Sequence, residues 1–175
     1  MNIILIGFRG TGKTTIGKIL ARQLGKEFID ADIYLEKKEG MSITDIFAKG
    51  GEPLFRDIES KVIAELSLLD GKVIATGGGA VLREENVKHL KKRGIIILLD
   101  ADANTLYKRI HRDSHTRQRR PNLTAKGGFE EVQFLLEQRM PIYDRIADFV
   151  INTAHVSVDS VAHKIQTLIH DYVRS

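Results

Sequence analysis

Residues 7–15, GFRGTGKTT, have types and a spacing suited to holding the phosphate groups of a nucleotide. They match the pattern G-x-x-x-x-G-K-[ST] and lie between an apolar run and a segment with helical periodicity. The glycines allow the backbone to wrap closely around phosphate oxygens at a helix N-terminus. We expect the Lys13 ammonium to reach the β- and γ-phosphates and the Thr14 hydroxyl to ligate Mg²⁺. The competing interpretation is a glycine-rich turn that only connects a strand to a helix.

A second metal contact normally comes from an aspartate at the end of a neighbouring strand, and two positions compete for it. Asp100 closes the apolar run at residues 95–99, and helix capping beside Asp102 is a sufficient explanation for it. Asp30 and Asp32 place two carboxylates on one strand-to-helix turn. We therefore expect Asp30 to bind Mg²⁺, through water, and Asp32 to hold the acceptor hydroxyl. Helix capping is the alternative for this pair as well.

Contacts to a phosphoryl acceptor should come from groups that the nucleotide does not use. Arg56 and Glu59 are spaced i, i+3 in an expected helix, so the carboxylate can orient the guanidinium. Residues 77–79, Gly-Gly-Gly, follow a strand and present backbone N–H groups without side chains. Arg139, taken alone, is most simply a surface charge. These groups favour an ATP- and magnesium-dependent kinase for a small anionic acceptor, without naming that acceptor.

The segment at residues 108–120 is strongly basic, with six Lys or Arg and one Asp. It has no apolar periodicity, and we expect a lid at about residues 111–126 that closes over the phosphates. A solvated charged loop is the plain alternative. A nucleic-acid surface is disfavoured because no aromatic side chain lies among the arginines for base stacking. His111 and His115 are spaced for metal binding on a helix, but neighbouring arginines repel a cation and no third ligand is evident.

The elements that must position these groups alternate along the chain. Short apolar strands are expected at residues 2–6, 27–29, 72–75, 94–99 and 149–151. Helices are expected at residues 13–24, 31–38, 52–69, 84–92, 103–110, 128–145 and 158–173. Short strands that are apolar on both faces indicate a parallel sheet covered on both sides. The fold class is α/β, and residues 1–175 form a single domain.

Composition excludes several classes of protein. The chain has 175 residues, 42% hydrophobic, with a net charge of +4 and no cysteine, so disulfides and thiolate metal sites are excluded. The longest apolar runs are far shorter than the ~20 residues that span a bilayer, and no signal peptide is expected, which indicates a cytoplasmic protein. A guanine-reading N-K-x-D sequence is absent, which argues against a GTPase. The length leaves little room for the coupling domains of a motor ATPase.

Taken in order, these motifs resemble the shikimate kinase family over nearly the whole chain. The shared segments are GFRGTGKT at 7–14, DAD at 30–32, FRDIE at 55–59, TGGG at 76–79, RP at 120–121 and RMPIY at 139–143. The resemblance implies that ATP phosphorylates the 3-hydroxyl of shikimate, in the route to chorismate and the aromatic amino acids. It also implies a five-stranded parallel P-loop kinase fold, an acceptor-binding subdomain at about residues 31–60, and a closing lid.

The same resemblance assigns roles to residues. Arg56 and Arg139 would clamp the shikimate carboxylate, and Asp32 would hold the acceptor hydroxyls beside the backbone of the glycine loop. Lys13 and Arg120 would stabilise charge on the transferring phosphoryl group. The expected ATP-binding residues are Gly10, Thr11, Gly12, Lys13, Thr14, Thr15, Arg109, Arg120 and His155. The expected substrate-binding residues are Asp32, Arg56, Gly77, Gly78, Gly79 and Arg139, and the expected metal ligands are Thr14 and Asp30.

The basic segment departs from the family pattern, because Arg119-Arg120-Pro-Asn-Leu replaces the commoner Arg-Pro-Leu-Leu. Arg117, Arg119 and Arg120 are therefore all candidates for the phosphate contact. The expected partners are ATP with Mg²⁺ and shikimate, with no nucleic acid, no membrane and a monomeric chain. Two alternatives stay open: a gluconate- or nucleotide-type kinase, and a nucleotide-dependent binding module without turnover.

Overall fold

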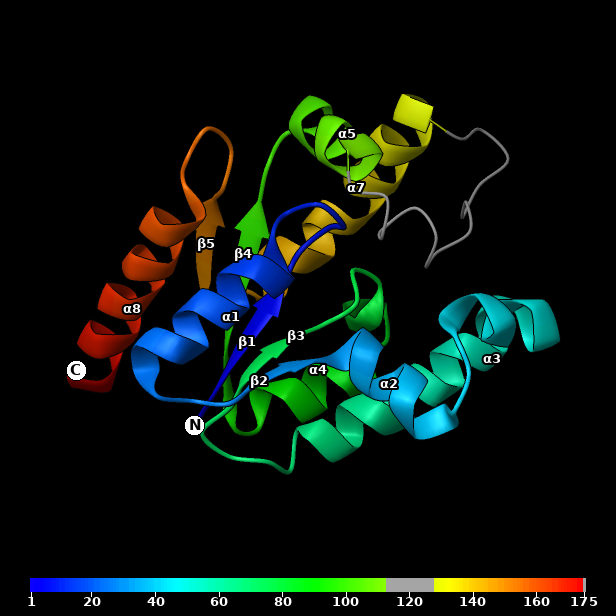
Figure 1. Ribbon diagram of the computed structural model, residues 1–175, viewed down its shortest axis with the longest axis horizontal. Coiled ribbons are helices and arrows are strands. Elements are labelled where there is room, and N and C mark those ends of the chain that lie inside the picture. The colour runs from blue at the N-terminus through cyan, green and yellow to red at the C-terminus, as the bar shows by residue number, and fades with distance from the viewer. Residues whose placement is uncertain (113–127, 175) are drawn as a thin grey trace.

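The computed structural model describes residues 1–112 and 128–174 (Figure 1). The strands are β1 (Asn2–Ile6), β2 (Phe28–Asp30), β3 (Val73–Ala75), β4 (Gly94–Asp100) and β5 (Phe149–Asn152). The helices are α1 (Lys13–Leu24), α2 (Ala31–Glu39), α3 (Ile43–Leu66), α4 (Glu84–Lys91), α5 (Ala103–Arg112), α7 (Gly128–Ile146) and α8 (Val158–Arg174). A 3-10 turn, η1 (Ala80–Leu82), follows the glycine loop.

The five strands form one parallel sheet in the order β2-β3-β1-β4-β5. Side chains of β1 alternate between its two faces, as the period of a strand requires. Ile4 and Ile6 belong to the core that α2, α3, α4 and α7 cover, whereas Ile3 and Leu5 belong to the core under α1 and α8 (Figure 1). The sheet is therefore buried on both sides, as its apolar strands predicted.

Loops that leave the carboxyl ends of these strands meet at one edge of the sheet, which is where parallel α/β folds bind ligands. Helix α3 bends at this edge because Gly51 has φ 67° and ψ −166°, a conformation that favours glycine. Its second half begins at Glu52-Pro53, in agreement with the expected helix start. Ser42 caps the first half by accepting a hydrogen bond from the Asp45 N–H at 3.1 Å.

The α/β class and the five parallel strands are confirmed, and the differences lie mainly at element ends. The strand expected at residues 27–29 is Phe28–Asp30, and the long helix ends at Leu66 rather than near Leu69. The turn η1 was not expected. The segment named as the lid falls almost wholly within residues 113–127, outside the described residues. Among the helices described, none is long and apolar enough to cross a membrane.

Candidate active site

The loop between β1 and α1 has the tight backbone that its glycines predicted. Gly7, Gly10 and Gly12 have φ values of 135°, 84° and 92°. A Cβ on Gly7 would lie 2.2 Å from the carbonyl oxygen of Leu99, so no other residue fits there. The Lys13 ammonium donates to the carbonyls of Gly7 and Phe8, at 2.8 Å each. The cation is therefore held beside its own loop, at the N-terminus of α1, where phosphate oxygens are favoured.

Asp30 caps α2, which is the alternative considered for it, and its second carboxylate oxygen contacts the phosphate loop. Its Oδ1 accepts hydrogen bonds from the N–H groups of Asp32 and Ile33, at 3.1 and 3.3 Å, and so caps α2. Its Oδ2 accepts a hydrogen bond from the Thr14 hydroxyl at 2.7 Å. Asp100, the competing candidate, does not line the cavity described below.

The two side-chain oxygens of Thr14 and Asp30 suit a hard divalent cation such as Mg²⁺. Within residues 1–112 and 128–174, no group of three or more His, Cys, Asp or Glu converges on one point. A magnesium ion held by Thr14 and Asp30 would therefore take its other ligands from phosphate oxygens and water, which is the usual arrangement for this cation.

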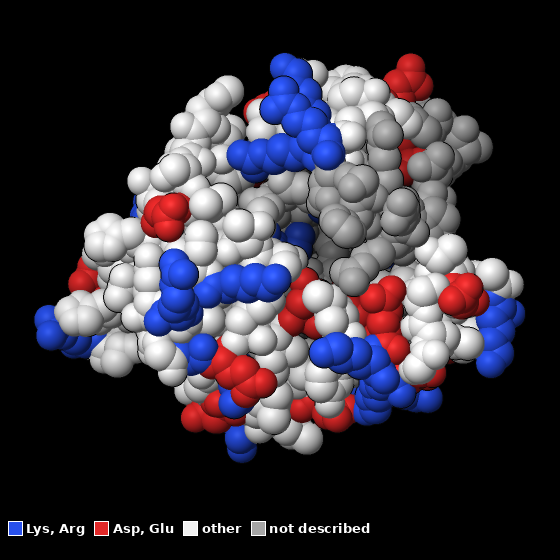
Figure 2. All heavy atoms as spheres, in the orientation of Figure 1, with Lys and Arg blue, Asp and Glu red and all other residues white. Residues whose placement is uncertain are grey.

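A cavity of about 300 Å³ joins the phosphate loop to the aspartate pair and the glycine loop. Its lining residues are Arg9, Gly10, Gly12, Lys13, Thr14, Thr15, Asp30, Asp32, Ile43, Thr76, Gly77, Gly78, Arg109 and Ile110. Figure 2 shows this face of the molecule hollowed near its centre, with basic atoms visible inside the hollow. Most of the residues expected at the donor and acceptor sites therefore lie around one space.

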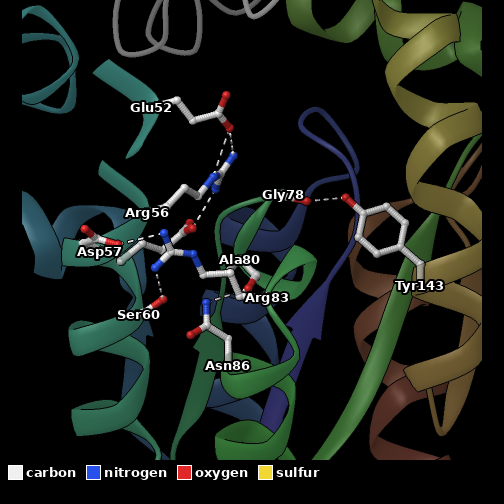
Figure 3. Close-up of polar contacts among 10 residues, drawn as sticks. Glu52, Arg56, Asp57, Ser60, Gly78, Ala80, Arg83, Asn86 and Tyr143 are labelled. Carbon is white, nitrogen blue, oxygen red and sulfur yellow. Dashed lines mark hydrogen bonds and ion pairs between the residues drawn. The ribbon is translucent and has the colours of Figure 1, made fainter. Parts of the chain in front are cut away.

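Arg56 is buried, with 7% of its surface exposed, and is held by two carboxylates (Figure 3). Its Nη1 donates to Glu59 at 2.6 Å, the contact that the i, i+3 spacing predicted. Its Nε and Nη2 donate to one oxygen of Glu52, at 3.1 and 2.9 Å. A Cβ on Gly79 would lie 2.3 Å from Nη2, so the guanidinium lies directly against the glycine loop. Sequence reasoning missed Glu52, although its i, i+4 spacing to Arg56 was a usable signal.

Arg139 is also buried, with 6% of its surface exposed, so its interpretation as a surface charge was wrong. Its guanidinium carbon lies 5.4 Å from the centroid of the Phe8 ring, within the range of a cation–π contact. A Cβ placed on Gly78 would lie 3.6 Å from Nη1 of Arg139. Neither Arg139 nor Arg56 lines the cavity itself. Each packs close to a glycine of the 77–79 loop that borders it.

Arg109 connects the phosphate loop to the loop after β5. It donates to the Gly10 carbonyl at 3.4 Å and to the Thr153 hydroxyl and carbonyl at 2.9 and 2.7 Å. A second cavity of about 200 Å³ adjoins this contact. Its lining residues are Gly10, Thr11, Gly12, Thr15, Ile16, Arg109, Thr153, Val156, Val158 and Val161. This space suits the apolar base of a nucleotide.

His155 was expected to bind ATP but does not line that second cavity; it has a positive φ of 57°. Val156 and Val158 line it instead and are 45% and 37% exposed. Sequence reasoning missed both valines, because two isolated valines give no signal that they face a ligand. Arg120, expected at the phosphates, lies outside the described residues.

Two carboxyl groups on the helices that carry or adjoin residues of the site have lowered pKa values. The hydroxyl and N–H of Thr105 donate to Asp102, at 2.6 and 2.9 Å, which lowers the pKa of this helix-capping carboxyl. Lys38 and then Tyr34 donate to Glu65 between α2 and α3, which lowers the pKa of Glu65. The same hydrogen bond to Glu65 raises the pKa of Tyr34. The first arrangement caps α5 and the second joins α2 to α3, and neither carboxyl group lines the cavity.

A glycine-rich loop of the phosphate-binding pattern at the start of α1, on a parallel sheet and beside a cavity, is typical of P-loop phosphotransferases. The comparisons with known proteins then specify the family. The family model for shikimate kinase matches residues 9–170, and the chain belongs to the shikimate kinase family.

Relatives and solved structures agree with this assignment. The shikimate kinase of Thermodesulfovibrio yellowstonii is 46% identical over 164 residues, covering 94% of this chain and 92% of the relative. That of Syntrophus aciditrophicus is 42% identical and covers 94% and 88%. The solved structure of the Acinetobacter baumannii shikimate kinase in complex with shikimate matches with a TM-score of 0.91 at 38% identity, covering 98% of this chain and 93% of that one. A gluconokinase from Sinorhizobium meliloti, with a TM-score of 0.61 at 18% identity, covers 99% of this chain and 97% of its own and shares the fold alone.

Proposed function

We propose that this protein transfers the γ-phosphoryl group of ATP to the 3-hydroxyl of shikimate, giving 3-phosphoshikimate and ADP on the route to chorismate and the aromatic amino acids. The observation that carries the proposal is the pairing of two loops around one cavity. The phosphate loop supplies the donor side, and a glycine loop with an arginine packed near each of its last two residues supplies the acceptor side.

On the donor side, the backbone N–H groups of the phosphate loop and the Lys13 ammonium would bind the triphosphate. Thr14 and Asp30 would hold Mg²⁺, which neutralises charge on the phosphate oxygens when it is bound. Arg109 would lie against the adenine, with Thr153 and Val156 lining the same space. Arg120 would stabilise the transferring group, a role that rests on the family resemblance.

On the acceptor side, Arg56 and Arg139 would bind the carboxylate of shikimate, since a planar anion suits bidentate guanidinium contacts. Asp32 would accept a hydrogen bond from the 3-hydroxyl and orient its oxygen toward the γ-phosphorus. A new bond then forms between the 3-hydroxyl oxygen and the γ-phosphorus as the bond between that phosphorus and the β,γ-bridging oxygen of ATP breaks. The hydroxyl proton passes to Asp32 or to solvent. A loose transition state makes alignment of the two substrates more important than a strong base.

The proposal extends to the organisation of the chain. Residues 31–60 would form the acceptor-binding subdomain, with the bend at Gly51 inside it. Residues 111–126 would close over the bound phosphates as a lid. We propose a cytoplasmic monomer whose partners are ATP and shikimate, with no nucleic acid or membrane.

Turnover with single acceptors tests this proposal. ADP release should require Mg²⁺ and shikimate together, and gluconate or a nucleoside monophosphate should not replace shikimate. ADP release with gluconate or a nucleoside monophosphate but not with shikimate would contradict the proposal.

A further inference from the structure

Tyr143 joins the helix that carries one arginine of the site to the glycine loop. It lies one turn after Arg139 on α7 and is 1% exposed. Its hydroxyl donates a hydrogen bond to the carbonyl oxygen of Gly78 (Figure 3). The same turn of α7 therefore places the Arg139 guanidinium near the point where a Cβ on Gly78 would lie, and the Tyr143 hydroxyl on the Gly78 carbonyl.

This hydrogen bond fixes the direction of the next N–H group. No peptide bond in the described part of the chain is cis, and a trans peptide holds its C=O and N–H on opposite sides. The N–H of Gly79 therefore points away from Tyr143. Figure 3 shows Arg56 on the other side of the glycine loop from Tyr143. The N–H of Gly79 and the Arg56 guanidinium therefore lie on the same side of the loop, away from Tyr143.

Three consecutive glycines cannot hold this arrangement by themselves, because each has wide backbone freedom and a peptide between two glycines can flip. The loop has a second support from Asn86, which is fully buried on α4. Its Nδ2 donates to the Ala80 carbonyl at 2.7 Å, just after the last glycine. Tyr143 and Asn86 therefore hold the loop from two different helices.

We propose that Tyr143 is a positioning residue for the acceptor. By binding the Gly78 carbonyl, it keeps the Gly79 N–H and the Arg56 guanidinium as a preformed set of donors for the acceptor carboxylate. This rests on the proposed function for the identity of the acceptor. It predicts an effect on acceptor binding that is larger than any effect on ATP binding.

The test is Tyr143→Phe, which removes only the hydroxyl, with Tyr34→Phe as the matched control. Tyr34 also donates from its hydroxyl, to Glu65 at 2.6 Å, but in the contact between α2 and α3. Tyr143→Phe should raise the KM for shikimate about fivefold to tenfold, the effect of one lost hydrogen bond, and change the KM for ATP less than about twofold. Tyr34→Phe removes a hydrogen bond made from the proposed acceptor-binding subdomain but away from the glycine loop, so it should change the KM for shikimate less than Tyr143→Phe does.

Amide hydrogen exchange of the ligand-free protein gives a second readout that does not depend on the acceptor. Tyr143→Phe should speed exchange at residues 77–80 and leave residues 13–16 unchanged. Unchanged exchange there, or equal rises in both KM values, would overturn the positioning role. If wild-type protein releases no ADP with shikimate, the proposed function fails, and the exchange measurement still decides whether Tyr143 holds the loop.

Discussion

The hydroxyl of Thr14 and the carboxylate of Asp30 meet at 2.7 Å, joining the first turn of α1 to the end of β2. Thr14 is fixed by the phosphate loop, whereas Asp30 is fixed by the N–H groups of α2 that it caps. Two segments that are distant in the sequence thus bring two oxygen atoms that could hold Mg²⁺ together beside the glycine-rich loop.

Asp30→Asn separates the metal role of Asp30 from its capping role. Asparagine caps a helix as well as aspartate does but lacks the negative charge that Mg²⁺ favours. We expect Asp30→Asn to keep near-normal thermal stability and to require at least tenfold more Mg²⁺ for half-maximal activity. Asp30→Ala should show the same rise in magnesium requirement, and its free energy of unfolding should also fall by about 1 kcal/mol because the helix cap is lost. Magnesium titrations of activity and thermal unfolding check both, and an unchanged magnesium requirement in Asp30→Asn contradicts the metal role.

Removal of either arginine beside the glycine loop should abolish most turnover while ATP still binds. Arg56→Ala and Arg139→Ala would each remove the buried charge proposed to contact the acceptor, and we expect kcat/KM for shikimate to fall at least 100-fold, about 3 kcal/mol. Arg83→Ala is the matched control. Arg83 pairs with Asp57 at 2.8 Å, at an exposed position where an ion pair contributes little. Steady-state kinetics and ATP titration measure these effects. Full activity in both variants would contradict the binding of the acceptor carboxylate by Arg56 and Arg139.

Gly79→Ala tests the close approach of the loop to Arg56. The added methyl group would lie 2.3 and 2.5 Å from Nη2 and Nη1 of a guanidinium that Glu52 and Glu59 already hold. The guanidinium must move, so the KM for shikimate should rise at least tenfold while the KM for ATP changes little. Kinetics for both substrates measure this. A normal KM for shikimate would mean that the position of Arg56 is not important for binding.

Asp102→Ala tests the cap of α5, the helix that carries Arg109. Hydrogen bonds from Thr105 lower the pKa of Asp102 in the folded protein. The ionised Asp102 carboxylate therefore contributes its full stability above the unfolded pKa of about 4, and this contribution is lost as pH falls through the folded pKa. Asp102→Ala should therefore cost about 1 kcal/mol at pH 7 and progressively less below pH 4. Denaturant unfolding at several pH values measures the difference, and a cost that does not depend on pH contradicts the ionised cap.

The backbone of the glycine-rich loop and its place between β1 and α1 were predictable from the sequence, because this loop is a local motif whose glycines require one tight conformation. The alternation of strands and helices likewise predicted the parallel sheet. The burial of Arg139 was not predictable in this way, since it depends on how α7 packs beside Phe8 and the glycine loop. Tyr143 and Asn86 act through contacts with a loop from other helices, and no local spacing reveals such contacts.

The central claim is that the two loops select shikimate as acceptor and direct transfer to its 3-hydroxyl. The most direct test offers the protein ATP, Mg²⁺ and an equimolar mixture of shikimate, gluconate and a nucleoside monophosphate, and identifies the products by mass and by phosphorus–proton coupling in NMR. We predict one product besides ADP, in which phosphorus couples to the proton at C3 of shikimate. Phosphorylated gluconate, a nucleoside diphosphate formed from the added monophosphate, or phosphate on another shikimate hydroxyl as the main product would contradict the claim.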